Sequence, residues 1–138
     1  MSGNVFIRVC DRDKRSIAPV AMTLRQLGYD LLATRGTAKT LRAAGIECRI
    51  VKPVREGHPN VIDLMADGEI AFLINTPHGH SSRGDGTKLR SEAVNRGIDM
   101  ATTMSGATAL VQAIVALRES SLGTYALQDL SKLAPAEE

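Results

Sequence analysis

The segment Thr34-Arg35-Gly36-Thr37 has residue types that could bind a phosphate group. It joins a stretch typical of a strand to a stretch with helical spacing. Gly36 permits a tight turn, and the following helix offers unpaired backbone N–H groups and the positive end of its dipole. The hydroxyls of Thr34 and Thr37 would complete an anion cradle. The alternative is that Thr37 only caps its helix, because threonine is a common N-cap residue.

Lys14, Asn75 and Thr76 are expected at the same edge of the fold. Lys14 begins a predicted helix, and its ammonium group could reach the same anion; a solvated surface lysine is the alternative. Asn75 ends an apolar run typical of a buried strand. Its amide could bind a base or a sugar, or it could cap a turn with Pro77. Because two strand–helix loops converge there, we favour a binding site at this edge.

Other residues that could take part in chemistry give weaker signals. His78 and His80 offer two metal ligands, but no nearby cysteine or ordered carboxylate completes a tetrahedral set, so we expect a solvated loop without metal. Cys10 and Cys48 each lie in an apolar stretch and are expected to be free, buried thiols. The motifs of dinucleotide enzymes, P-loop ATPases and ordinary serine hydrolases are absent from the sequence.

Strand-like and helix-like segments alternate along the chain. Strands are predicted at 5–9, 29–34, 48–51, 70–74 and 98–102. Helices are predicted from Asp11 or Asp13 to Gly28, from about residue 37 to Gly45, over 61–66, over 87–96, and from Ser105 to about Arg118. Asp11 or Asp13 would be the N-cap of the first of these helices, and Ser105 the N-cap of the last.

This alternation predicts an α/β fold. We expect one three-layer domain with a five-stranded, mainly parallel sheet and helices on both faces. In such sheets, ligands bind beyond the carboxyl ends of the strands, near the point where the strand order reverses. The domain is expected to cover residues 4–133, with a linker at 1–3 and a frayed tail at 134–138.

The composition argues against several functional classes. Of the 138 residues, 43% are hydrophobic and 23% are charged, which is ordinary for a globular domain. The net charge of only +2 argues against a nucleic-acid surface, and the aromatic content of 3% argues against base-stacking platforms. No apolar run is long enough to cross a bilayer, and no basic-then-apolar leader opens the chain, so we expect a soluble cytoplasmic protein.

Six short motifs occur in a specific order along residues 4 to about 130. They are Asp13-Lys14, Leu32–Ala38, Val54–Asn60, Ile74–Pro77, Asp85 with Leu89-Arg90, and Thr102-Thr103. In order and approximate spacing they resemble the C-terminal regulatory domain of the carbamoyl-phosphate synthase large subunit, which has a methylglyoxal-synthase-like fold. The Val-x-Glu-Gly-x-Pro and Ile-Asn-Thr-Pro runs are the most specific, since neither strand nor helix formation requires them.

The resemblance implies a non-catalytic domain that binds a nucleotide effector, with UMP as inhibitor and IMP as activator in many bacteria. The family's full-length, oligomeric enzyme makes carbamoyl phosphate from bicarbonate, glutamine-derived ammonia and ATP, with Mg or Mn, for pyrimidine and arginine biosynthesis. The implied partners are the rest of the large chain and a small glutaminase subunit. No cofactor is expected in the domain itself.

The resemblance also assigns roles to residues. The effector phosphate would be bound by Lys14, Thr34, Gly36, Thr37 and Lys52, and the ribose and base by Asn75, Thr76 and Asp85. The sequence departs from the family at Pro53, where a lysine is frequent; Lys52 is one residue earlier, and adjacent positions of an extended chain point to opposite sides. Arg8 is a second departure, because small residues are frequent at its position.

Two alternative functions remain open. A stand-alone methylglyoxal synthase-type lyase acting on dihydroxyacetone phosphate would share the fold and the phosphate site. It needs a catalytic carboxylate where this chain has Gly57-His58-Pro59, and Asp85 alone does not restore the required pair. The similar inosinate cyclohydrolase domain would carry a Lys-Thr-Leu-His-Pro run, which is absent. The other alternative is a purely structural module at a subunit contact.

Overall fold

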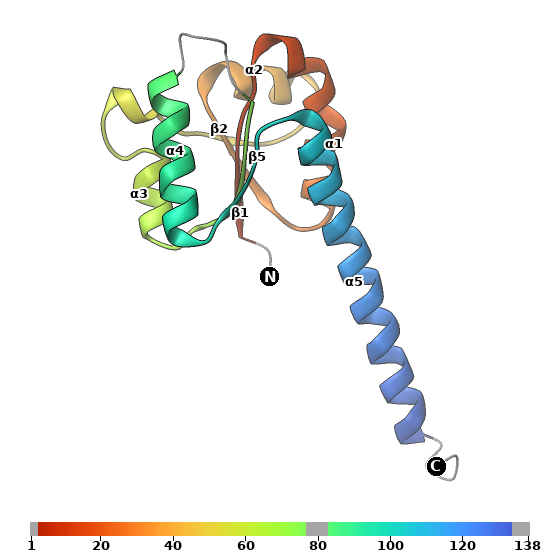
Figure 1. The fold of residues 1–138 in the computed structure, drawn as a ribbon. Coiled ribbons are helices and arrows are strands. Elements are labelled where there is room, and N and C mark those ends of the chain that lie inside the picture. Colours follow the sequence, from red (N-terminus) through yellow and green to blue (C-terminus); the bar gives the residue numbers. More distant parts are fainter. Residues whose placement is uncertain (1–2, 77–82, 134–138) are drawn as a thin grey trace.

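The fold is built on one parallel sheet. The computed structural model describes residues 3–76 and 83–133. Over these residues every strand pair is parallel, and the strand order is β3-β2-β1-β4-β5 (Figure 1). The strands are β1 (Asn4–Arg8), β2 (Asp30–Ala33), β3 (Arg49–Ile50), β4 (Ile70–Asn75) and β5 (Asp99–Ala101). The predicted five-stranded sheet is confirmed.

Helices cover both faces of the sheet (Figure 1). One face packs against α1 (Lys14–Gln26), α2 (Arg35–Ala43) and α5 (Met104–Leu133), and the other against α3 (Val61–Ala66) and α4 (Arg83–Arg96). Short 3₁₀ turns at Asp11–Asp13 and Val54–Glu56 precede α1 and α3. The single three-layer α/β domain is therefore confirmed.

The core consists of two apolar clusters, one on each face. Val5 and Ile7 of β1 are fully buried in the cluster with α1, α2 and α5. Phe6, between them in the sequence, packs with Val61 of α3 and Leu89 of α4. Because both faces of the sheet are covered, successive side chains in the middle of the central strands are apolar, which explains the continuous hydrophobic runs in the sequence.

The strand order reverses between β1 and β4. From the central β1 the chain adds β2 and β3 on one side, and then crosses to add β4 and β5 on the other. Open α/β sheets bind ligands in the crevice outside the carboxyl ends of the strands at such a point. The chain leaves β1 after Arg8 and β4 after Asn75 at this point, so Asn75 and Thr76 lie where the topology favours a ligand.

Most predicted boundaries agree with the structure within a few residues. α3 has the predicted bounds, and Gly28 ends α1 with a φ of 96° that favours glycine. α4 begins at Arg83 and not at Thr87, because the glycine-rich segment predicted to be a loop contributes the first turn of the helix.

α5 differs most from its prediction. Thr103 caps it in place of Ser105, since the Thr103 Oγ1 accepts a hydrogen bond from the Gly106 N–H at 2.9 Å. The helix continues past Arg118 to Leu133 and extends beyond the rest of the fold in Figure 1. A single glycine in this stretch costs only about 1 kcal/mol relative to alanine and does not end the helix. Neither α5 nor any other helix in the described ranges has the length and apolar content needed to cross a bilayer.

Candidate functional site

α2 begins directly after β2 and leaves its N-terminal end open. Thr34 is the N-cap residue: its backbone is extended (φ −71°, ψ 164°), and its carbonyl accepts the Ala38 N–H at 2.8 Å. The Thr34 side chain makes no capping hydrogen bond. The first amide groups of a helix have no intrahelical partner, so α2 presents N–H donors and its positive dipole end at the carboxyl edge of the sheet.

Lys14 lies against this helix start. Its Nζ is 3.3 Å from the point that a Cβ atom on Gly36 would occupy, and its side chain is 25% exposed. The absence of a side chain at position 36 therefore allows the close approach of the ammonium group. The predicted convergence of Lys14 with the 34–36 segment is confirmed. A positive charge beside helix N–H groups is a favourable environment for an anion.

Thr37 lies inside α2, and its hydroxyl is used by the fold. The side chain is 1% exposed, and its Oγ1 accepts a hydrogen bond from the Val9 N–H at 3.2 Å. The alternative in which Thr37 caps α2 is wrong, because Thr34 occupies the cap position. A hydroxyl that accepts one hydrogen bond still has a proton to donate, so the contact between Thr37 and a phosphate stays a prediction.

Asn75 carries an unpaired acceptor at the end of β4. The residue is 6% exposed, and within the described part of the chain its Oδ1 is buried with no hydrogen-bond partner. Its Nδ2 is 3.7 Å from the point that a Cβ atom on Gly86 of α4 would occupy. An unpaired buried acceptor costs about 1–3 kcal/mol, and most native proteins avoid it. This cost is offset if a ligand supplies the missing donor.

Thr76, Cys10 and Asp13 form a hydrogen-bonded group at the switch point. The Thr76 side chain is 1% exposed, and its Oγ1 accepts the Cys10 N–H at 2.9 Å. The Cys10 thiol donates to Oδ2 of Asp13 with 3.1 Å between sulfur and oxygen. This bond is the main cause that lowers the pKa of Asp13, although partial burial opposes it. Asp13 occupies the N-cap position of α1, as predicted, but its carboxylate binds Cys10 and not a helix N–H.

The structure adds contacts that the sequence analysis did not assign. Asp11 Oδ1 lies 2.6 Å from Lys14 Nζ, and the i, i+3 spacing of the two residues was the available signal. Arg35 Nη2 lies 3.8 Å from Glu56 Oε1, which brings the 3₁₀ turn after β3 close to the start of α2. Nothing in the sequence links Arg35 to a residue so far along the chain.

The loop after β3 contains an imidazole–carboxylate pair. His58 Nδ1 lies 2.7 Å from Asp63 Oδ2, and the His58 side chain is 79% exposed. Asp63 also accepts the Asn60 N–H at 2.8 Å, and the Asn60 side chain in turn caps α3. The hydrogen bond from His58, followed by the one from Asn60, lowers the pKa of Asp63. The carboxylate therefore fixes both the imidazole and the start of the helix.

Two of the predicted site residues, Lys52 and Asp85, are not brought into the site by described contacts. Lys52 is exposed and forms an isolated bridge with Asn60. Asp85 lies in the first turn of α4, and its side chain is outside the described part of the structure, as are His78 and His80. In the described ranges no three potential ligands cluster to hold a metal ion.

The two cysteines and Arg8 are placed by the structure. Both cysteines are free thiols, as predicted, but only Cys10 is buried, while Cys48 is partly exposed. Burial is the main cause that raises the pKa of the Cys48 thiol. Arg8 is 9% exposed at the end of β1, next to Asn75 in the sheet register.

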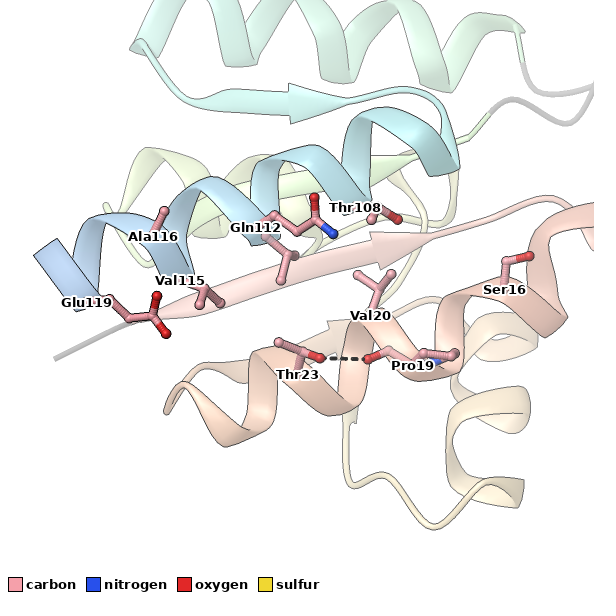
Figure 2. A pocket seen from close by; sticks show the side chains of 10 residues that line it. Ser16, Pro19, Val20, Thr23, Thr108, Gln112, Val115, Ala116 and Glu119 are labelled. Carbon is pink, nitrogen blue, oxygen red and sulfur yellow. Dashed lines mark hydrogen bonds between the residues drawn. The ribbon is translucent and has the colours of Figure 1, made fainter.

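Two hollows on the surface lie away from the predicted site. A groove of about 400 Å³ runs between α1 and α5, with Val20 of α1 and Val115 of α5 projecting into the space between the two helices (Figure 2). A second hollow, of about 420 Å³, lies near the amino ends of the strands and is lined by charged residues such as Arg25 and Arg42. Neither hollow is lined by a residue predicted to bind the phosphate, whose candidate residues lie at the carboxyl edge of the sheet.

Comparison with known proteins identifies related chains. The profile of the MGS-like domain family matches residues 16–102. The "Carbamoyl phosphate synthase large chain, C-terminal section" of Methanopyrus kandleri is 46% identical over 133 residues, which are 96% of this chain and 24% of that protein. The "Carbamoyl phosphate synthase large chain" of Corynebacterium glutamicum is 41% identical over 140 residues, covering 97% of this chain and 13% of that protein.

The comparisons also bear on the length of the relatives and on the fold. The chain spans only about a quarter or less of the length of these two curated relatives. Among solved structures, the "Crystal structure of ForH" superposes with a TM-score of 0.56 at 20% sequence identity, covering 81% of this chain and 79% of that one. At this identity the likeness supports the fold alone.

Proposed function

Because the chain belongs to the family of MGS-like domains, we propose that it is the effector-binding, regulatory part of a carbamoyl-phosphate synthase large chain. The similarity of nearly the whole chain to a limited part of such large chains supports this proposal. The domain binds a nucleoside monophosphate, with UMP as inhibitor and IMP as activator, and does not transform it.

The observation that carries the proposal is the position of Lys14. Its ammonium group lies against Gly36 in the first turn of α2, where backbone N–H donors and the helix dipole also favour negative charge. A phosphate monoester fits this arrangement, because it carries up to two negative charges and several acceptor oxygens. Thr34, whose side chain makes no capping bond, has a hydroxyl that could add a donor.

The unpaired Oδ1 of Asn75 supports a ligand with more than a phosphate group. Inorganic phosphate at neutral pH offers few donors, whereas a ribose hydroxyl or a base N–H would pair with this acceptor. Asn75 and Lys14 follow neighbouring strands at the switch point, so one ligand could reach both. We therefore assign the phosphate to the Lys14 side of the rim and the nucleoside to the Asn75 side.

In the full-length enzyme, the domain would act on a reaction that takes place elsewhere. The larger protein would make carbamoyl phosphate from bicarbonate, glutamine-derived ammonia and ATP with Mg or Mn, in the cytoplasm, for pyrimidine and arginine synthesis. Its partners would be the rest of the large chain and the small glutaminase subunit. An effector changes the activity only if it binds two states of the enzyme with different affinity.

Calorimetry of the 138-residue chain with UMP and with IMP tests the binding proposal. Lys14→Met should weaken the binding of either nucleotide by about 1.5–3 kcal/mol, roughly ten- to hundredfold, because a charge-assisted contact is lost. Lys39→Met is the matched control, since Lys39 is an exposed lysine further along α2. Absence of binding heat with both nucleotides, or equal affinity of the Lys14 variant, would contradict the proposal.

The lyase alternative has one structural observation in its favour. Asp63 orients the imidazole of His58, and this loop is where a lyase would need its base. However, the same carboxylate belongs to the capping box of α3, which gives it a structural role. Formation of methylglyoxal from dihydroxyacetone phosphate by the purified chain, abolished in a His58→Ala variant, would establish the lyase. We expect no turnover.

A further inference from the structure

The ammonium group of Lys14 already has an anionic partner, Asp11. Asp11 Oδ1 lies 2.6 Å from Lys14 Nζ, and the same Nζ lies 3.3 Å from the Cβ position of Gly36. The Asp11 carboxylate is thus bound to the cation that lies at the start of α2. We propose that Asp11 is an internal competitor for the anion site, which a phosphate monoester must displace from Lys14. This inference rests on the proposed effector site.

A cation at this position needs a counter-ion. Lys14 is the first residue of α1, and its ammonium group lies in the first turn of α2, so it is close to the positive ends of two helix dipoles. Positive charge at a helix N-terminus is unfavourable, whereas negative charge there is favourable. Asp11 supplies the negative charge from the 3₁₀ turn that directly precedes α1.

The Asp11 carboxylate is placed so that a ligand can displace it. Its side chain is 91% exposed, so it is already largely hydrated while it pairs with Lys14. Exposed ion pairs make small net contributions, so breaking this one costs little. Asp13, two residues later, is different, because the Cys10 thiol binds its carboxylate and its side chain is only 17% exposed. Of these two carboxylates, Asp11 is therefore the one that can exchange with a ligand.

Competition makes a specific prediction about affinity. Removing the charge of Asp11 leaves Lys14 and the helix donors in place but removes the competing anion and its repulsion. Asp11→Asn should therefore bind UMP and IMP about two- to fivefold more tightly than the parent chain. Inorganic phosphate should show the same gain, because the competition concerns the phosphate group alone. The gain should shrink in high salt, since the Asp11 side chain is exposed.

Two variants serve as controls in this calorimetric titration. Asp30→Asn removes the same charge from an exposed aspartate that also pairs with a basic side chain, Arg25 at 2.9 Å, but at the amino end of β2. It should bind all three ligands as the parent chain does. Asp11→Glu keeps the charge and should also bind close to the parent affinity. Thermal melts of each variant establish that the comparison is made between folded proteins.

The outcomes separate this inference from the function on which it rests. Tighter binding by Asp11→Asn, with no change in Asp30→Asn, supports internal competition. Unchanged or weaker binding by Asp11→Asn, in a parent chain that binds the nucleotides, overturns the competition and leaves the proposed function intact. An equal gain in both variants would show a general charge effect and would also overturn it. If no protein binds UMP, IMP or phosphate, the proposed function and the competition both fail.

Discussion

The Cys10 N–H donates a hydrogen bond to the hydroxyl of Thr76 at 2.9 Å and so joins the end of β1 to the end of β4. The preceding amide, that of Val9, donates to the hydroxyl of Thr37 in α2 at 3.2 Å. Two successive backbone groups at the switch point are therefore paired by threonine side chains from different elements. Both threonines are 1% exposed. If either hydroxyl were removed, water could not easily reach the backbone N–H that it accepts from.

Thr34 and Thr37, at the start of α2, should respond differently to alanine substitution. Thr37→Ala leaves the Val9 N–H without its acceptor and should lower the free energy of unfolding by about 1–3 kcal/mol. Thr34→Ala should change it by less, because the Thr34 side chain makes no capping bond. Urea denaturation measures both. Thr37→Ser, which keeps the hydroxyl, is the control, and equal loss in Thr34→Ala and Thr37→Ala would contradict the assignment.

Gly36→Ala should weaken the binding of a nucleoside monophosphate without destabilising the fold. The new Cβ would lie 3.3 Å from Lys14 Nζ, so the ammonium group must shift by a few tenths of an ångström from its position against the start of α2. Alanine has a higher helix propensity than glycine, by up to about 1 kcal/mol, so the protein should be at least as stable.

A double-mutant cycle checks this explanation of the Gly36 variant. In a Lys14→Met background, Gly36→Ala should cause no further loss of affinity, because the displaced group is already absent. Calorimetry of the four proteins gives the coupling. Additive losses would mean that the methyl group acts on the ligand and not through Lys14.

Asn75→Leu should bind a nucleoside monophosphate about tenfold more weakly and yet be as stable as the parent chain, or more stable. The substitution removes a buried oxygen that has no partner in the described part of the chain. The matched control is Asn60→Leu, which should lower stability by about 0.5–2 kcal/mol because the Asn60 side chain caps α3. Calorimetry and urea denaturation test the pair. A large loss of stability in Asn75→Leu would mean that its amide has a structural role.

The pair formed by His58 and Asp63 should make stability depend on pH in the acidic range. Hydrogen bonds from His58 and then from Asn60 lower the pKa of Asp63 in the folded protein below the usual value of an aspartate carboxyl. A lowered folded pKa adds stability that is fully present above the unfolded value and is lost as the pH falls through the folded value. Stability should therefore decline below about pH 4.

Unfolding of the parent chain and of Asp63→Asn, measured between about pH 2.5 and 7, checks this dependence. The variant should be less stable at neutral pH and should show a smaller decline in acid. Asp67→Asn, an exposed residue at the end of α3, is the control and should follow the parent. Parallel curves for the parent and Asp63→Asn would rule out this source of pH dependence.

Local patterns were sufficient to predict the sheet and the loops at its carboxyl edge. The apolar runs at 5–9 and 70–74 identify buried strands because both faces of the sheet are covered. Gly28 and Gly97 end helices with positive φ, a conformation that favours glycine and is therefore visible in sequence. The start of α4 was missed because its first turn is rich in glycine, and the length of α5 was missed because no strong stop signal precedes Pro135.

The composition of the site was only partly predictable. Lys14 and Gly36 were placed together because each follows a strand end, and topology brings strand ends to one edge. The use of the Thr37 hydroxyl by Val9 depends on residues 28 positions apart, and the bond between Thr76 and Cys10 on residues 66 positions apart. Such contacts follow from three-dimensional packing, which neither periodicity nor motif spacing encodes. The binding roles of all the candidate residues stay predictions.

The length of α5 has a mechanical consequence. Arg118 anchors the helix to the body of the fold, because its guanidinium group lies 5.4 Å from the centre of the Tyr29 ring and donates to the Leu27 carbonyl. From Arg118 to Leu133 the helix covers about 22 Å at 1.5 Å per residue. Tilting it by about 10° at Arg118 would carry its far end roughly 4 Å sideways, so a small rotation where α5 packs on the body would become a larger displacement at Leu133.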